Sequence, residues 1–328
     1  MITTVVGNYP KIPDLPASGK WRTAVEKFQK GQIDEAALRQ VEDEVTLEAI
    51  RDQVEAGVDL ITDGQIRWDD GQTYFARRLR GFSVNGLQRY FDTNVYYRAP
   101  AAEGKISWLE PITVRDFTFA REHSPRPVKP VITGPFTLAR LSHNAHYPTV
   151  REFVVSLAKE LNKELRALEA AGAETVQVDE PSLCKHTQEF ALFAEAMGVL
   201  TDGVKARKIL CTYFGDVGGV YPQILDLPFD VIGLDFVAGH RNWDAVRQAP
   251  FTKGLMFGIL DARNTRMETV DEVVAALRRI TEVVAPDRLM VSPSAGLEFL
   301  PQGVARRKLQ VLVEGTRAAA QALKGVRT

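Results

Sequence analysis

The sequence predicts an α/β fold, specifically a TIM (β/α)8 barrel built by a single domain of residues 1–328. Eight short apolar segments with the composition of β-strands recur along the chain, and helical segments separate most of them. Such alternation requires right-handed crossovers between parallel strands, and eight of these units are the number that closes a barrel. Polar side chains also follow directly after the strand segments, as they do at the catalytic end of a barrel.

The central segment is the clearest of the eight. Residues 150–171 carry apolar side chains three and four positions apart, which is typical of one helical face, and Gly172 ends that helix. β-branched residues then favour a strand, which Pro181 terminates because proline has no backbone N–H for the ladder. Asp179 and Glu180 are therefore expected at the carboxyl end of a buried strand.

The remaining elements are assigned by the same patterns. The predicted strands are 3–6, 58–62, 129–133, 175–178, 207–213, 229–235, 254–260 and 288–292. The predicted helices are 34–56, 111–122, 150–171, 188–197, 243–247, 270–284 and 304–323. A polar, proline-rich stretch up to Gln32 is interpreted as an excursion over one end of the barrel. The aromatic-rich region around 77–110 has no clear period and is interpreted as an inserted loop or hairpin.

Composition narrows the classes of function. A formal net charge of −1 gives no reason to expect nucleic acid or a membrane surface as a partner. The chain shows no basic and apolar leader at its start and no apolar run of membrane-spanning length, so a cytoplasmic location is expected. Cys184 and Cys211 are too few for a disulfide framework in a chain of 328 residues.

Polar residues follow every predicted strand. They are Asn8, Asp63 with Gln65, Thr133, Asp179 with Glu180, Cys211 with Tyr213, Asp235, Asp261 with Arg263, and Ser292 with Ser294. Loops are polar in general, so part of this set is explained without any ligand. Carboxylates, an amide and an arginine together nevertheless suit a small zwitterionic substrate, whose ammonium binds carboxylates and whose carboxylate binds arginine or backbone N–H groups.

Five motifs carry a family resemblance. They are Val5-Val-Gly-Asn-Tyr-Pro10, Asp63-Gly-Gln-Ile-Arg-Trp-Asp-Asp70, Thr133-Gly-Pro135, Gln177-Val-Asp-Glu-Pro181 and Ser292-Pro-Ser-Ala-Gly-Leu-Glu298. In this order they resemble the catalytic domain of cobalamin-independent methionine synthase, in its short single-barrel form. The resemblance implies a TIM barrel in which zinc binds the homocysteine sulfur as a thiolate, and a methyl group is transferred to that sulfur to give methionine.

The resemblance also implies site residues. Asp179, with Glu180 beside it, matches the motif that holds the substrate ammonium. Gln65 matches an acidic residue of the family and keeps an acceptor without the charge, and Gly7-Asn8 matches a Gly-Ser turn. The residues expected to take part in catalysis are Asp261, Arg263 and Tyr213.

The zinc positions depart from the family pattern. Cys211 and Asp235 occupy two of them, whereas Ile209 and Ala295 stand where the family has metal ligands and can bind no metal. His240 completes such a site only if its loop folds inward. A catalytic zinc keeps three protein ligands, so zinc is doubtful here.

The methyl donor is also open. The family's folate-associated tryptophan falls near Leu141, which favours a methylated corrinoid protein over methyltetrahydrofolate as the donor.

Three hypotheses follow. The first is a methyltransferase of this family acting on a thiol such as homocysteine. The second is a zinc-less barrel that works as a subunit or binding module with a zinc-bearing paralogue. The third is a metal-independent lyase of the wider uroporphyrinogen-decarboxylase-like barrels, with Asp179, Arg67 and Arg263 holding an acidic substrate.

Overall fold

The computed structural model describes residues 1–14 and 19–325 of the chain. The chain divides into two compact units. Unit 1 comprises Met1–Arg67, Phe119–Val128 and Gly254–Thr328, and unit 2 comprises Trp68–Thr118 and Lys129–Lys253. Each unit is described by itself.

Unit 1 contains three parallel strands, in the order β1 (Ile2–Thr3), β12 (Leu289–Pro293) and β11 (Gly254–Leu260). The predicted strand 58–62 is reduced to isolated parallel bridges, from Leu60 to Thr4 and from Ile61 to Val128. Side chains accept from the N–H groups on either side of these bridges, because Asp59 N donates to the Thr3 hydroxyl and Thr62 N donates to a side-chain oxygen of Gln53. The prediction of a regular strand there was wrong.

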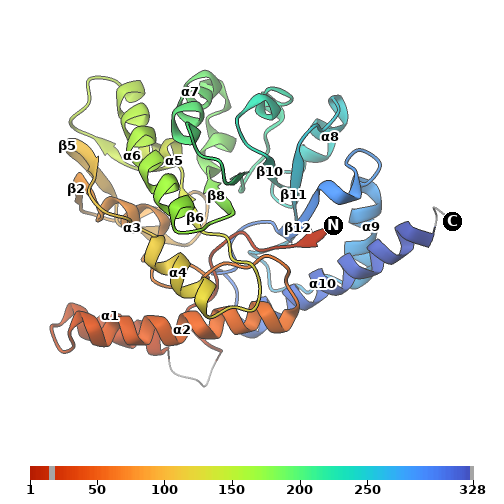
Figure 1. Ribbon diagram of the computed structural model, residues 1–328, viewed down its shortest axis with the longest axis horizontal. Helices are drawn as coiled ribbons and strands as arrows, with labels where there is room; N and C mark the ends of the chain where they lie inside the picture. The colour runs from red at the N-terminus through yellow and green to blue at the C-terminus, as the bar shows by residue number, and fades with distance from the viewer. Residues whose placement is uncertain (15–18, 326–328) are drawn as a thin grey trace. The chain divides into compact units, whose positions relative to one another are not determined.

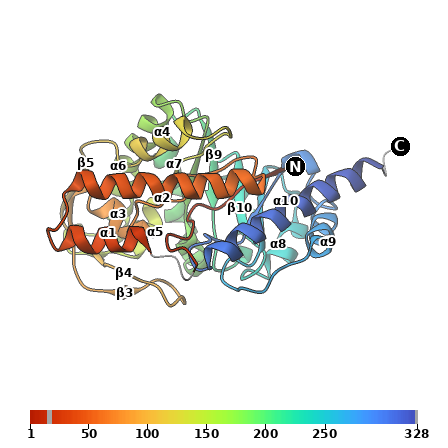
Figure 2. The same cartoon turned by 90° about the horizontal axis from the view of Figure 1, so that it is seen from below.

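Four long helices belong to unit 1: α1 (Lys20–Gln29), α2 (Glu35–Ala56), α9 (Val270–Ile280) and α10 (Gln302–Gly325). The Asp34 carboxylate caps α2 by accepting from Ala37 N at 2.8 Å, and Gly57 ends the helix with a left-handed φ of 86°. Helix α2 packs against α1 and α10 (Figure 2). Helix α1 lies in the stretch predicted to be an irregular excursion, of which residues 15–18 are outside the described residues.

Unit 2 contains four parallel strands, in the order β10 (Val231–Asp235), β9 (Arg207–Cys211), β8 (Thr175–Asp179) and β6 (Val131–Thr133). Their register aligns Thr133 with Asp179, Asp179 with Cys211, and Cys211 with Gly233. The carboxyl ends of β6, β8 and β9 are therefore level with one another.

The crossover helices of unit 2 are α5 (Pro135–Arg140), α6 (Val150–Ala170), α7 (Phe190–Thr201) and α8 (Asn242–Gln248). Helix α6 packs against both α5 and α7 (Figure 1), and its predicted apolar face, including Phe153, Leu157 and Leu165, is buried. Short 3-10 turns complete the set: η1 (Pro181–Lys185), η2 (Thr187–Glu189), η3 (Gly218–Val220), η4 (Gln223–Asp226) and, in unit 1, η5 (Pro286–Arg288).

The inserted region around 77–110 forms antiparallel structure. Strands β2 (Leu79–Val84) and β5 (Pro100–Trp108) pair antiparallel, and β7 (His143–Asn144) joins β5 in parallel. A second hairpin pairs β3 (Gln88–Arg89) with β4 (Tyr96–Tyr97). Helix α3 (Gly71–Ala76) precedes the insertion, and α4 (Val114–Glu122) follows it.

The fold class is therefore α/β with parallel strands, as the sequence predicts. Seven of the eight predicted strand segments are strands, and the eighth contributes the bridges at Leu60 and Ile61. Closure of an eight-stranded barrel stays a prediction. Among the described residues, no helix is both long and apolar enough to span a membrane.

Candidate functional site

Asp179 is the last residue of β8, and its side chain is held by two other side chains. Gln177 Nε2 donates to Asp179 Oδ1 at 2.7 Å, and the Tyr213 hydroxyl donates to Oδ2 at 3.4 Å. Burial raises the pKa of the Asp179 carboxyl to about 7, against the opposing effects of the Gln177 hydrogen bond and the Lys129 charge. A cation bound here would favour the ionised carboxylate, so the site is suited to an ammonium group.

Lys129 lies beneath this carboxylate in the core of unit 2. Its side chain is 0% exposed, and its Nζ donates to Gln177 Oε1. Burial lowers the pKa of Lys129 to about 8, while the nearby Cys211 and Asp179 oppose that shift. The sequence interpretation missed this residue, and the available signal was a lysine at the start of an otherwise apolar predicted strand.

Glu180 follows Asp179 but turns to a different neighbour. Its Oε1 accepts from Phe136 N at 2.9 Å, and its Oε2 accepts from the Thr137 N and hydroxyl at 2.7 and 2.6 Å. Burial raises the pKa of Glu180 to about 8. Its contacts anchor the first turn of α5, and its predicted substrate contact stays a prediction.

Tyr213 connects the carboxylate to an aromatic cluster, which consists of Tyr90, Phe91, Tyr97, Tyr213 and Phe214. The Tyr213 hydroxyl lies 3.4 Å from that of Tyr90, and the Tyr213 and Phe214 rings meet edge to face at 4.8 Å. Burial raises the pKa of Tyr213 well above its usual value, so the phenol keeps its proton and can donate to Asp179. Phe91 and Phe214 have left-handed φ values of 50° and 64°, a costly conformation for non-glycine residues that is found repeatedly at ligand sites.

Asp235 ends β10 in the same way that Asp179 ends β8, but backbone groups surround it. Its Oδ2 accepts from Phe214 N at 3.0 Å, and its Oδ1 accepts from Val237 N and Ala238 N at 2.8 and 2.9 Å. Asp235 therefore fixes the loops that follow β9 and β10.

In unit 1 the structure brings together Gly7 and Gln65. A Cβ on Gly7 would lie 2.8 Å from Gln65 Nε2, so any larger residue at position 7 would have to displace the Gln65 amide. Gln65 is 1% exposed with a left-handed φ of 51°, and neither its Nε2 nor its Oε1 has a hydrogen-bond partner among the described residues. A buried amide without hydrogen-bond partners destabilises the folded state, so the Gln65 side chain is suited to bind a polar ligand.

The loop that contains Asn8 meets the Ser292–Glu298 motif within unit 1. Leu297 N donates to Asn8 O at 2.8 Å, and a Cβ on Gly296 would lie 3.0 Å from Asn8 Cβ. These contacts place Asn8 against the end of β12.

Asp261 and Arg263 form a turn after β11. Arg263 N donates to Asp261 Oδ1 at 2.9 Å, and Asp261 N donates to Glu268 Oε1 at 2.8 Å. The Arg263 side chain is exposed. The predicted catalytic roles of Asp261, Arg263 and Tyr213 stay predictions.

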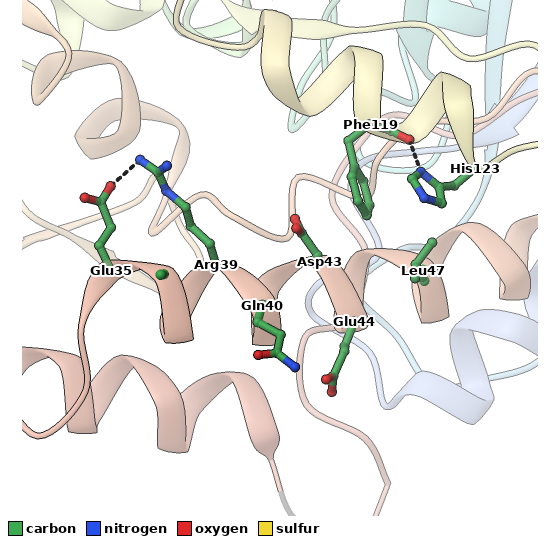
Figure 3. A pocket seen from close by; sticks show the side chains of 9 residues that line it. Glu35, Arg39, Gln40, Asp43, Glu44, Leu47, Phe119 and His123 are labelled. Carbon is green, nitrogen blue, oxygen red and sulfur yellow. Dashed lines mark hydrogen bonds and ion pairs between the residues drawn. The ribbon is translucent and has the colours of Figure 1, made fainter.

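A surface groove of about 630 Å³ lies along α2, where the end of α4 faces it (Figure 3). Its lining includes Glu35, Arg39, Asp43, Phe119 and His123, and the His123 Nδ1 lies 2.8 Å from Phe119 O. None of the predicted site residues lines this groove.

Comparison with known proteins identifies the family. The family of the cobalamin-independent synthase catalytic domain matches residues 1–318. The chain belongs to the cobalamin-independent methionine synthase family. It is 33% identical over 325 residues to the methionine synthase of Saccharolobus solfataricus, covering 98% of this chain and 96% of that protein. The methionine synthase of Sulfurisphaera tokodaii is also 33% identical, with 98% and 93% covered.

Solved structures show the same fold. The B12-independent methionine synthase from Shewanella sp. W3-18-1, in complex with selenomethionine, superposes with a TM-score of 0.87 at 22% identity, covering 98% of both chains. The B12-independent methionine synthase from Listeria monocytogenes, described as putative in its source, superposes with a TM-score of 0.75 at 20% identity.

The residues at the positions that the resemblance assigns to zinc do not fit that metal. Ile209 and Ala295 are buried and carry no donor atom, and His240 lies exposed on a turn. The Asp235 oxygens accept three backbone N–H groups. Within residues 1–14 and 19–325, no group of three His, Cys, Asp or Glu side chains could hold a metal ion. Burial also raises the pKa of the Cys211 thiol well above its usual value.

Proposed function

We propose that this protein is a methyltransferase that transfers a methyl group to the sulfur of homocysteine to give methionine. The observation that carries the proposal is the carboxylate of Asp179, which is buried at a strand end and held by Gln177 and Tyr213. Family membership supports the same reaction.

The role assigned to Asp179 is to bind the α-ammonium of the amino acid. A carboxylate in a site of low dielectric attracts a cation more strongly than it would in water, and a charged hydrogen bond contributes about 1.5 to 3 kcal/mol. Gly7, Asn8, Gln65 and Glu180 are retained as proposed substrate-binding residues. Gln65 is the strongest of these four, because its buried amide offers a donor and an acceptor that no described residue uses.

The residues at the metal positions around Cys211 favour a second candidate function. With only Cys211 and Asp235 at the family's metal positions, the protein would act as a single-domain barrel subunit that binds the amino acid beside a zinc-bearing paralogue. The methyl donor in either case is a methylated corrinoid protein or methyltetrahydrofolate. The lyase hypothesis has no comparable support.

The test is methionine formation from homocysteine, measured by mass spectrometry with each donor in turn. The protein is assayed alone and together with a zinc-bearing paralogue. Methionine formed by the protein alone supports the first candidate, and methionine formed only with the paralogue supports the second. Absence of methionine in every combination, together with absence of methionine binding, would overturn both.

A further inference from the structure

We propose that Lys129 is a positioning residue for the amino-acid site, which fixes the orientation of the Gln177 carboxamide and through it the carboxylate of Asp179. This inference rests on the proposed role of Asp179. Lys129 itself is not expected to contact the substrate.

The argument begins with the hydrogen-bonding capacity of the three side chains. An ammonium group can only donate, so Lys129 Nζ requires an acceptor, and Gln177 Oε1 is within hydrogen-bond distance of it. The other end of the carboxamide is then necessarily Nε2, which donates to Asp179 Oδ1 at 2.7 Å. A flipped carboxamide would place its NH2 against the ammonium and its oxygen against the carboxylate, and both contacts would be repulsive.

Burial restricts the Gln177 carboxamide to this orientation. Lys129 and Gln177 are both 0% exposed, so water cannot compensate for a flipped amide. Strand register supports the arrangement from the backbone, because Val131 on β6 is aligned with Gln177 on β8. Lys129 lies two residues before β6, and Gln177 lies within the neighbouring parallel strand β8.

The arrangement is costly for stability. Burial lowers the pKa of Lys129 to about 8, which reflects the free energy needed to keep an ammonium group in the core. Buried ionic groups can often be replaced by apolar residues of similar volume without loss of stability. A lysine at this position therefore needs a reason other than stability, and the orientation of Gln177 supplies it.

The experiment compares Lys129→Met with wild type by calorimetric titration of methionine and by thermal melting. The expected result is methionine binding weakened about tenfold, with a melting temperature equal to or above that of wild type. The matched control is Lys253→Met in the same unit, because Lys253 Nζ donates to the carbonyl oxygens of Leu227 and Phe229, which precede β10. That control should leave methionine affinity unchanged.

A double-mutant cycle separates a positioning role from a general structural one. In the Asp179→Asn background, Lys129→Met should cause no further loss of affinity, because the residue through which it acts is already altered. Unchanged affinity in Lys129→Met, or an equal loss in both backgrounds, would overturn the inference. If Asp179→Asn alone binds methionine as tightly as wild type, the proposed function fails instead.

If Lys129→Met does not fold, the Gln177→Glu variant tests the same inference. This substitution retains an acceptor for Lys129 but replaces the donor to Asp179 with an oxygen, which reproduces the orientation that Lys129 excludes. It should weaken methionine binding at least as much as Lys129→Met. Wild-type affinity in a folded Gln177→Glu protein would contradict the inference.

Discussion

The ends of β8 and β10 carry the same residue in the same position but in different surroundings. Asp235 accepts hydrogen bonds from the backbone N–H groups of Phe214, Val237 and Ala238. Asp179 accepts from two side chains, Gln177 and Tyr213. The backbone donors of Asp235 belong to the loops that follow β9 and β10, whereas one of the side-chain donors of Asp179, Gln177, is itself bonded to the buried Lys129.

The comparison shows that a strand-end aspartate is not by itself evidence of a binding site. The partners decide its role, and one partner of each aspartate is distant in the sequence: Tyr213 is 34 positions from Asp179, and Phe214 is 21 positions from Asp235. On this account Asp235 stabilises unit 2, and Asp179 binds the substrate.

The largest effect is expected for Asp235→Ala. The buried N–H group of Phe214 and the part-buried N–H groups of Val237 and Ala238 lose their acceptor. A buried donor left unsatisfied costs about 1 to 3 kcal/mol, and a donor that water can reach costs less, so the free energy of unfolding should fall by about 3 kcal/mol. Denaturant unfolding measures the loss. A loss below about 1 kcal/mol would mean that Asp235 is not structural and that the contrast with Asp179 is wrong.

A smaller effect is expected for the pH dependence of stability at Asp179. Because burial raises the folded pKa of Asp179 to about 7, well above that of an exposed aspartate, the carboxyl stabilises the fold while protonated. That contribution is complete below the unfolded pKa and is lost as pH rises through about 7. The melting temperature of wild type relative to Asp179→Asn should therefore fall between pH 4 and pH 7.5. A difference that is constant or rises with pH would contradict the assignment.

The smallest effect is expected for zinc. A ligand present at a hundred times its Kd stabilises the native state by about 2.7 kcal/mol, so zinc binding would raise the melting temperature. With Ile209 and Ala295 at two positions that the resemblance assigns to zinc ligands, added zinc should leave the melting temperature of wild type and of Cys211→Ser equally unchanged. A rise in wild type that Cys211→Ser abolishes would restore the metal hypothesis.

Much of the fold follows from local pattern. The limits of β11 and the first residue of β8 agree with the prediction, and the helices predicted to stop at Gly57 and Gly172 end within two residues before these glycines. The prediction of a regular strand at 58–62 was wrong because two of its backbone N–H groups donate to the side chains of Thr3 and Gln53. The local sequence pattern gives no sign of these hydrogen bonds. Helix α1 was missed because proline-rich sequence precedes it.

From the sequence, only the site residues that lie at the ends of strands could be predicted. Asp179 and Cys211 could be placed because parallel strands end level with one another. Lys129 could not, since its hydrogen-bond acceptor, Gln177, is 48 positions away. The sequence also did not reveal that Asp179 and Asp235 have different kinds of hydrogen-bond partner, because each is an aspartate at the end of an apolar strand segment.

The most direct test of the central claim compares methionine with 4-(methylthio)butanoate, which lacks only the amino group. Calorimetric affinities for both are measured with wild type and Asp179→Asn. Wild type should prefer methionine by about 1.5 to 3 kcal/mol, the contribution of a hydrogen bond to a charged group, and Asp179→Asn should lose that preference. An Asp179→Asn protein that keeps the full preference would show that Asp179 does not bind the ammonium.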